Sequence, residues 1–246
     1  MASRPIKRRN SLPIYAIVGD GYSEKIYFEQ LREVEKIKNI QIKPDLPNRS
    51  GKGASFVRVM EKAEQLLEQG YDKVYCIIDF DTVIKEQKTG SFSANKARLE
   101  KKGIVVLICN PCFEIWYLLH FKKTGKLFSN CDSVADVLKQ ETDLTDYSKE
   151  QAYYNKKNLY KYLRLKLPTA VENAQFLEID RDTQGLYFPK AEIFKIIQAL
   201  VLKQKTRIFD NFKTPLSISM NLFFQHLPHS YYIISLSNFN EIKTFI

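Results

Sequence analysis

The sequence predicts an α/β fold in which a mainly parallel sheet is covered by helices on both faces. Three short runs, at residues 14–18, 74–78 and 104–108, are continuously apolar and rich in β-branched residues. Strands that are buried on both faces have this composition, whereas half-exposed strands alternate apolar and polar residues. Helical patterns separate the three runs, and strands that alternate with helices are typical of a parallel sheet.

The first half of the predicted core begins with the strand IYAIV at 14–18. Residues 23–34 follow, with apolar side chains spaced for one face of a helix. Residues 39–43 alternate apolar and polar side chains, as in a half-exposed strand. A second amphipathic helix covers about residues 56–67, and Gly70 marks its end.

The second half of the core contains the other two buried strands. The run VYCII at 74–78 leads into the sequence Asp-Phe-Asp, and a helix is expected over about 91–102, with Gly103 closing it. The run IVVLI at 104–108 is the third strand. Asn110 and the proline after it then begin an apolar helix.

Beyond residue 130 the patterns predict helices at about 132–140, 148–166, 169–177 and 190–203. Residues 214–240 contain no charged side chain other than histidine and differ in composition from the rest. The predicted organisation is a basic disordered arm at 1–12, an α/β core at 13–125, a helical part packed on the core at 126–205, and an extension at 206–246.

The charge balance favours a polyanionic partner. The chain carries 38 Lys and Arg residues against 28 Asp and Glu residues, a formal net charge of +10. Clustered cationic side chains bind phosphate backbones by releasing counterions, which points to nucleic acid. A basic surface that binds nothing would have the same composition.

Neither a signal peptide nor a membrane span is predicted. The apolar run after the basic N-terminal residues ends at Asp20, and no stretch approaches the roughly 20 apolar residues of a spanning helix. Cys76, Cys109, Cys112 and Cys131 are therefore expected to be reduced thiols in a cytoplasmic protein.

Acidic residues follow all three apolar strands. Asp20 follows the first, Asp79 and Asp81 end the second, and Asn110 and Glu114 follow the third. The carboxyl ends of parallel strands meet at one edge of a sheet, where α/β proteins bind ligands. Carboxylate oxygens suit Mg²⁺, so the pattern predicts a magnesium site, with the two aspartates of the D-x-D pair on the same side of the strand end. Aspartates that only cap turns would give the same spacing.

Three runs in this region resemble the RloB-like family: DGYSEKIYF (20–28), IIDFDT (77–82) and NPCFEIWYLLHF (110–121). The resemblance covers residues 12–125 well, is weaker to about residue 204, and is absent beyond. It implies a Toprim-type, Rossmann-like fold, the magnesium-dependent module shared by topoisomerases, primases and OLD-type nucleases. It also implies a role in defence against phage or foreign DNA.

The resemblance implies roles for the matching residues. Asp79 and Asp81 would hold Mg²⁺ or Mn²⁺. Asp20 stands where the module has a glutamate before glycine, and this shorter side chain would complete the ion shell or move a proton. Glu24 would assist Asp20. The alternative is that Glu24 is only a first-turn glutamate, which the helix dipole stabilises. Glu114 would act at the edge of the site.

A basic, tyrosine-rich stretch at 147–166 is a second candidate region. Its cations are expected to contact phosphates and its tyrosines to stack on unpaired bases. The alternative is an amphipathic helix whose tyrosines face the core, and this alternative is favoured for most of them. The predicted phosphate contacts are Lys52, in the earlier loop RSGKG, and Lys156, Lys157, Lys161 and Arg164.

Two other patterns are interpreted as structural. Cys109 and Cys112 form a C-x-x-C pair, but the chain has no second pair to complete a zinc site. His120 lies in an apolar helical run and is expected to pack in the core.

These patterns and the resemblance together predict a magnesium-dependent nuclease that acts on RNA or DNA, with other defence-system subunits as further partners. The alternative is a non-catalytic subunit that binds nucleic acid or a protein partner. A third hypothesis is magnesium-dependent chemistry on a nucleotide.

Overall fold

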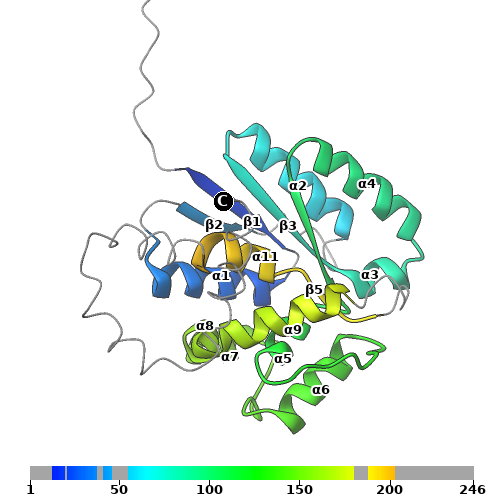
Figure 1. Cartoon of the computed structure of the whole chain (residues 1–246). Coiled ribbons are helices and arrows are strands. Elements are labelled where there is room, and N and C mark those ends of the chain that lie inside the picture. The colour runs from blue at the N-terminus through cyan, green and yellow to red at the C-terminus, as the bar shows by residue number, and fades with distance from the viewer. Residues whose placement is uncertain (1–12, 20, 38–40, 46–54, 180–187, 203–246) are drawn as a thin grey trace, which may run out of the picture.

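The computed structural model describes residues 13–19, 21–37, 41–45, 55–179 and 188–202. Five strands form one sheet in the order β2-β1-β3-β4-β5, in which the short β5 is antiparallel to β4 and the other pairs are parallel (Figure 1). The strands are β1 (Ile14–Val18), β2 (Gln41–Asp45), β3 (Lys73–Asp79), β4 (Val105–Asn110) and β5 (Lys190–Ala191). The predicted α/β class with a mainly parallel sheet is confirmed.

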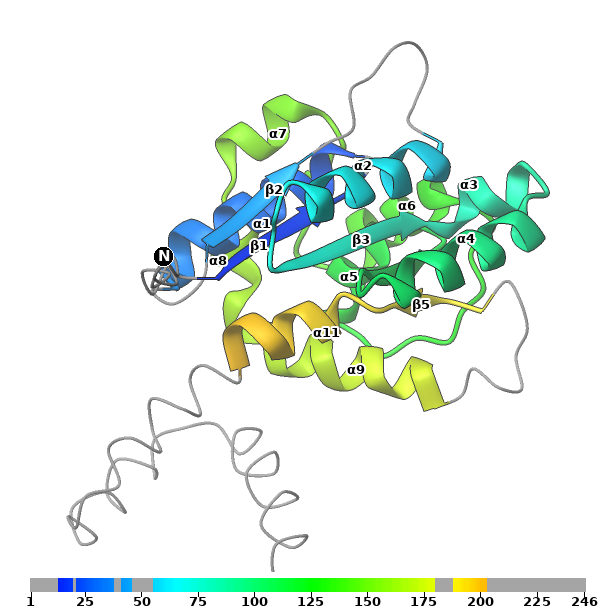
Figure 2. The ribbon, with the colours of Figure 1, turned by 90° about the horizontal axis from the view of Figure 1, so that it is seen from above.

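Helices cover both faces of this sheet, as Figure 2 shows from above. One face carries α2 (Phe56–Glu68), α3 (Phe80–Lys85) and α4 (Thr89–Lys101), and the other carries α1 (Tyr22–Glu35), α5 (Glu114–Leu119), α9 (Leu167–Ile179) and α11 (Phe194–Ile197). Side chains of β3 alternate between the two cores: Cys76 and Ile78 face the first group of helices, and Tyr75 and Ile77 the second. Burial on both faces explains why the strand runs are continuously apolar.

The C-terminal half of the described chain is helical and packs on the same core as α1 and α5. Trp116 of α5 and Tyr160 of α8 are both fully buried in this core. The remaining elements are α6 (Cys131–Glu141), α7 (Gln151–Lys156), α8 (Leu159–Leu163), a 3-10 turn (Arg164–Lys166) and a π-helical turn (Gln198–Leu202). The predicted helical C-terminal part is thereby confirmed.

Most predicted boundaries agree with the structure to within a few residues. Gly70 and Gly103 have φ angles of 89° and 90° and follow α2 and α4, as expected of helix stops. The strand predicted at 39–43 instead covers 41–45. The helix expected from Asn110 begins at Glu114, because Asn110 still pairs with β5.

The long helix predicted at 148–166 is wrong. α7 ends at Lys156, and the side chain of Asn158 accepts a hydrogen bond from the Lys161 amide at 2.8 Å, which begins α8. Asparagine is a strong N-cap, so it starts a new helix where the apolar period alone indicated a continuous one. The predicted helix at 190–203 likewise begins later, because Lys190 pairs with Asn110 of β4. α3 was not predicted.

Within the described part of the chain, no helix combines the length and apolarity that a membrane crossing requires. The predicted arm at 1–12 and extension at 206–246 lie outside the described residues.

Candidate functional site

The carboxyl ends of β1 and β3 lie where the strand order reverses. β2 lies on one side of β1 and β3 on the other, so the chain extends the sheet in opposite directions from β1. Open α/β sheets bind ligands outside the strand ends at such a point. Gly19 follows β1 here, and Asp79 is the last residue of β3.

Glu24 brings a buried carboxylate to this edge. It lies in the first turn of α1, and only 3% of its surface is exposed. A Cβ atom added to Gly21 would lie 2.6 Å from Glu24 Oε2, and one added to Gly19 would lie 3.1 Å from Glu24 Cβ. The two glycines therefore leave the room that the Glu24 side chain occupies.

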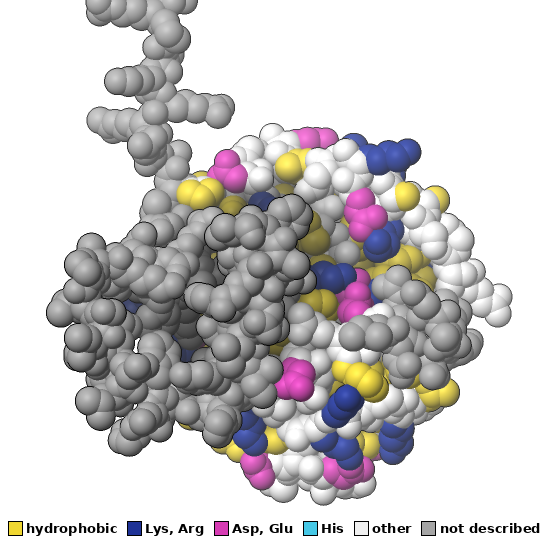
Figure 3. Space-filling model, viewed as in Figure 1, with side chains coloured by type: hydrophobic (Ala, Val, Ile, Leu, Met, Phe, Trp, Pro, Cys, Tyr) yellow, Lys and Arg dark blue, Asp and Glu magenta, His cyan; other side chains and the backbone are white. Residues whose placement is uncertain are grey.

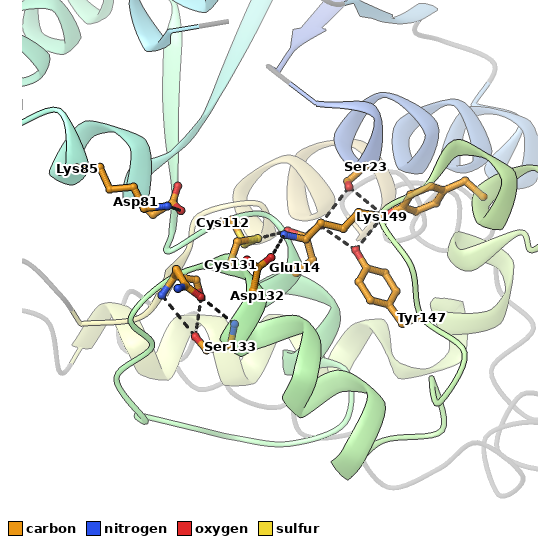
Figure 4. Close-up of polar contacts among 12 residues, drawn as sticks. Ser23, Asp81, Lys85, Cys112, Glu114, Cys131, Asp132, Ser133, Tyr147 and Lys149 are labelled. Atoms are coloured by element: carbon orange, nitrogen blue, oxygen red, sulfur yellow. Dashed lines mark hydrogen bonds and ion pairs between the residues drawn. A yellow bond between two sulfur atoms is a disulfide. The ribbon is translucent and has the colours of Figure 1, made fainter. Parts of the chain in front are cut away.

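The D-x-D pair spans the end of β3 and the start of α3. Asp81 lies in the first turn of α3, and its amide donates to the Pro111 carbonyl at 3.0 Å. Its Oδ2 accepts a hydrogen bond from Lys85 Nζ at 2.8 Å (Figure 4). The chain turns into a helix after Asp79, so Asp79 belongs to the strand and Asp81 to the helix that follows it.

Four carboxylates act on the buried thiol of Cys109, which lies opposite Asp79 in the β3–β4 pairing. Burial raises the pKa of this thiol well above its ordinary 9.0, and Asp79, Glu24, Glu192 and Glu114 raise it further, in that order. All four acidic groups therefore lie within electrostatic reach of this thiol.

Glu114 is the centre of a buried hydrogen-bond network (Figure 4). Its Oε1 accepts hydrogen bonds from the Tyr147 hydroxyl at 2.8 Å and from Ser23 Oγ at 3.2 Å. The Tyr154 hydroxyl lies 2.8 Å from Ser23 Oγ and 2.9 Å from the Tyr147 hydroxyl. Sequence reasoning missed this network, because its members are up to 131 residues apart and only the fold brings them together.

Asn110 has a structural partner at the same edge. Its Nδ2 donates to the Phe188 carbonyl at 2.7 Å, which holds the segment leading into β5 against the end of β4. This contact accounts for the burial of the Asn110 amide.

Cys112 and Cys131 are joined by a disulfide, with their Cα atoms 5.6 Å apart. The prediction of four reduced thiols is confirmed for Cys76 and Cys109, which are buried and form no disulfide, and is wrong for the other two. The C-x-x-C spacing gave no sign of this pairing, because Cys131 is 19 residues from Cys112 and meets it only where α6 packs against α5.

Within the described ranges, one group of three metal-ligating side chains has its ligand atoms within 4.8 Å of one another, and it consists of Cys112, Glu114 and Cys131. Asp79, Asp81 and Glu24 do not form such a group there. Asp20, the fourth predicted carboxylate, lies outside the described residues.

Two of the predicted phosphate contacts are exposed, and two are paired with acids. Lys156 and Lys161 are exposed and have no ion pair among the described residues. Lys157 Nζ lies 2.9 Å from Asp146, and Arg164 Nε lies 2.6 Å from Glu35. Lys52 lies outside the described residues.

The tyrosines of this stretch are mainly structural. Tyr147, Tyr154 and Tyr160 are buried, so these three tyrosines face the core, although the stretch is not the single amphipathic helix that was predicted. Tyr153 is only partly buried, and Tyr162 is exposed. On the face shown in Figure 3, the described Lys and Arg side chains are interspersed with Asp and Glu rather than gathered in one patch.

The sequence comparisons agree with this architecture. A family model described as RloB-like protein matches residues 15–200, which include the edge of the sheet discussed above and the described strands except the first residue of β1. No curated protein and no solved structure matches the chain significantly.

Proposed function

Because the chain belongs to the RloB-like protein family, we propose that it is a magnesium-dependent nuclease acting on RNA or DNA. The observation that carries the proposal is the concentration of carboxylates at the switch point of the sheet. Asp79 ends β3, Asp81 lies in the first turn of α3, and Glu24 lies over the turn after β1. A Toprim-type fold and a role in defence against phage or foreign DNA belong to the same proposal and rest on the resemblance.

The donor set at this edge fits a hard divalent cation. Asp79 and Asp81 would hold Mg²⁺ or Mn²⁺ through carboxylate oxygens, with Asp20 completing the set. In the structure the Lys85 ammonium lies 2.8 Å from Asp81 Oδ2, so the ion would bind the other oxygen of Asp81 or displace Lys85. When bound, the ion would polarise the scissile phosphate and lower the pKa of the attacking water.

The neighbouring acids would have different tasks. Glu24 is buried and held in place by the glycine turn, so it would accept a proton from the attacking water, a task it would share with Asp20. Glu114 would act at the edge of the site as a positioning residue, since Ser23 and Tyr147 hold its Oε1.

Nucleic acid would contact the exposed lysines of α7 and α8. Lys156 and Lys161 carry charges that no described acid neutralises, whereas Lys157 is paired with Asp146. Each lysine that releases a counterion from the phosphate backbone adds about one unit to the slope of log affinity against log salt concentration. The substitutions Lys156→Ala and Lys161→Ala together should therefore lower that slope, while Lys101→Ala, an exposed lysine of α4 on the opposite face of the sheet, should not.

A non-catalytic binding subunit is the second candidate. Two observations favour it: Lys85 occupies one oxygen of Asp81, and Asp20 stands where the Toprim module has a glutamate. Such a protein would bind nucleic acid or a protein partner without cleaving it.

The experiment compares purified full-length protein with its Asp79→Asn variant on single- and double-stranded RNA and DNA, in Mg²⁺, Mn²⁺ or EDTA. Asp72→Asn is the matched control, because Asp72 lies before the other end of β3 and its Oδ2 accepts a hydrogen bond from the Ile14 amide. We expect metal-dependent cleavage in the wild type and the control, and none in Asp79→Asn.

Cleavage that persists in EDTA or in Asp79→Asn would overturn the proposal. Metal-independent binding without cleavage by the wild type would instead support the non-catalytic candidate. Turnover of free nucleotides without cleavage of polymers would identify a nucleotide as the substrate.

A further inference from the structure

The Cys112–Cys131 pair lies against the buried Glu114 carboxylate, which is not among the proposed ligands of the magnesium ion. Glu114 Oε2 is 2.9 Å from Cys131 Sγ, and Glu114 is 3% exposed. A disulfide sulfur carries no hydrogen, so in the oxidised pair this contact cannot be a hydrogen bond. Oε2 then has no donor among the described residues, although burying a charged oxygen without a partner is costly.

The other oxygen of the same carboxylate is fully engaged. Tyr147 and Ser23 both donate to Oε1, which fixes the orientation of the carboxylate and directs Oε2 towards the two sulfurs (Figure 4). Metal-binding carboxylates and histidines are commonly oriented by hydrogen bonds of this kind to the atoms that do not ligate the metal.

We propose that Cys112, Cys131 and Glu114 form a Zn²⁺ site when the disulfide is reduced. Their ligand atoms already lie within 4.8 Å of one another. In a tetrahedral zinc site with Zn–S bonds of about 2.3 Å, ligand atoms are about 3.5–4 Å apart, so small side-chain rotations suffice. Two thiolates and one carboxylate suit zinc better than magnesium, because thiolates are soft ligands.

The chemistry has two balanced steps. A thiol reductant supplies two electrons and two protons, which converts the disulfide to two thiols while the reductant is itself oxidised to a disulfide. Zinc then replaces the two thiol protons, which are released to solvent, and Glu114 Oε2 provides the third ligand. A water molecule takes the fourth position, and the oxidised and zinc-bound forms exclude each other.

The site is reachable and connected to the edge of the sheet. Cys131 is partly exposed at the start of α6, so reductant and metal have access, whereas Cys112 is buried. Pro111, which precedes Cys112, accepts the amide hydrogen of Asp81 through its carbonyl at 3.0 Å. Either the zinc ion or the disulfide would therefore fix the segment Pro111–Cys112, to which the Asp81 amide is hydrogen-bonded. The zinc proposal itself does not require that the protein be a nuclease.

The test uses Co²⁺ as a spectroscopic probe on the full chain, freed of metal and reduced with a phosphine. We expect one thiolate-bound cobalt ion per chain, with thiolate-to-cobalt charge-transfer bands in the near ultraviolet that Zn²⁺ abolishes by displacement. The disulfide form of the same protein should show no bands, and reduction should restore them. This comparison needs no substitution, so a folding defect cannot confuse it.

Variants assign the ligands. Cys131→Ser should abolish the bands, whereas Cys76→Ala, at a buried cysteine of β3 outside the disulfide, should retain them. Tyr147→Phe should weaken cobalt binding by about 10- to 100-fold, the usual effect of losing a partner of a metal ligand. Absence of the bands in the reduced wild type, or equal bands in Cys131→Ser, would overturn the proposal. Asp79→Asn should leave the bands unchanged, which separates this site from the proposed magnesium site.

Discussion

His120 should make the stability of the protein depend on pH in a way that one substitution removes. The ring is 1% exposed and lies across the Trp116 ring, with centroids 4.8 Å apart, so the prediction that it packs in the core is confirmed. Its Nδ1 lies 2.8 Å from the Trp116 carbonyl. A carbonyl only accepts, so Nδ1 carries the proton, and Nε2 has no hydrogen-bond partner among the described residues.

The magnitude follows from the pKa of this ring. Burial lowers the pKa of His120 from its ordinary 6.5 to about 4, and the positive charge of Lys166 also opposes protonation. The unfolded chain therefore binds a proton as the pH falls below about 6.5, while the folded protein does not until about pH 4. The contribution of the neutral His120 ring to the free energy of unfolding is fully present above pH 6.5. It is lost on acidification, by about 2 kcal/mol between pH 7 and pH 4.5.

The assay is urea unfolding of the wild type and His120→Gln at pH 7, 5.5 and 4.5. Glutamine does not titrate, so the variant should lose about 2 kcal/mol less than the wild type over this range, even if it is less stable at pH 7. The other two histidines and the carboxylates are present in both proteins, so their contributions cancel in the comparison. Equal pH dependence in the two proteins would refute the assignment of a buried, neutral His120.

Three further substitutions test the candidate site. Gly21→Ala should displace the Glu24 carboxylate, the proposed proton acceptor, and lower the rate of nucleic-acid cleavage at saturating Mg²⁺, while the melting temperature changes little, because the φ angle of −120° suits alanine; an unchanged cleavage rate would contradict this role of Glu24. Tyr147→Phe should lower the free energy of unfolding by about 2 kcal/mol in denaturant unfolding, because it removes a hydrogen bond to the buried Glu114 carboxylate. A decrease below about 0.5 kcal/mol would show that water replaces this hydrogen bond. Asn130→Ala should cost about 1 kcal/mol in the same assay, because Asn130 caps α6; no change would mean that the cap contributes nothing.

The strands could be predicted from the sequence because burial on two faces leaves a local signature. In β3, alternate side chains enter different cores, yet both cores are apolar, so the whole run from Val74 to Ile78 had to be apolar. The helix stops at Gly70 and Gly103 were equally local. The two-residue β5 has no such signature, since only its pairing with β4 makes it a strand.

The candidate site could be predicted only in part, because only some of its features leave a local pattern in the sequence. Acidic residues after successive strands indicate which edge of the sheet is functional, because topology alone brings strand ends together. The partners of those acids depend on packing between distant helices. Neither the Lys85 ion pair of Asp81 nor the Tyr147 hydrogen bond of Glu114 has a sequence pattern that separates it from solvated charge or core packing.

The run from Asn110 to Glu114 connects the strand end, which the sequence predicts, with the contacts between distant helices, which it does not. Asn110 holds the segment before β5 through the Phe188 carbonyl, and the Pro111 carbonyl accepts the amide of Asp81 at the start of α3. Cys112 is bonded to the first residue of α6, and Glu114 accepts hydrogen bonds from α1 and from the segment before α7.

Contacts from four of these five residues fix the ends of separate elements around one edge of the sheet. NPCFE, within the most specific run of the family resemblance, is the segment that holds the strand end and the neighbouring helices together. This structural role explains the resemblance without requiring that its residues take part in chemistry. Glu114 is best understood within this segment as a positioning residue, and the chemistry proposed for the edge then falls to Asp79, Asp81 and Glu24, of which Asp81 is bonded to the segment through its amide.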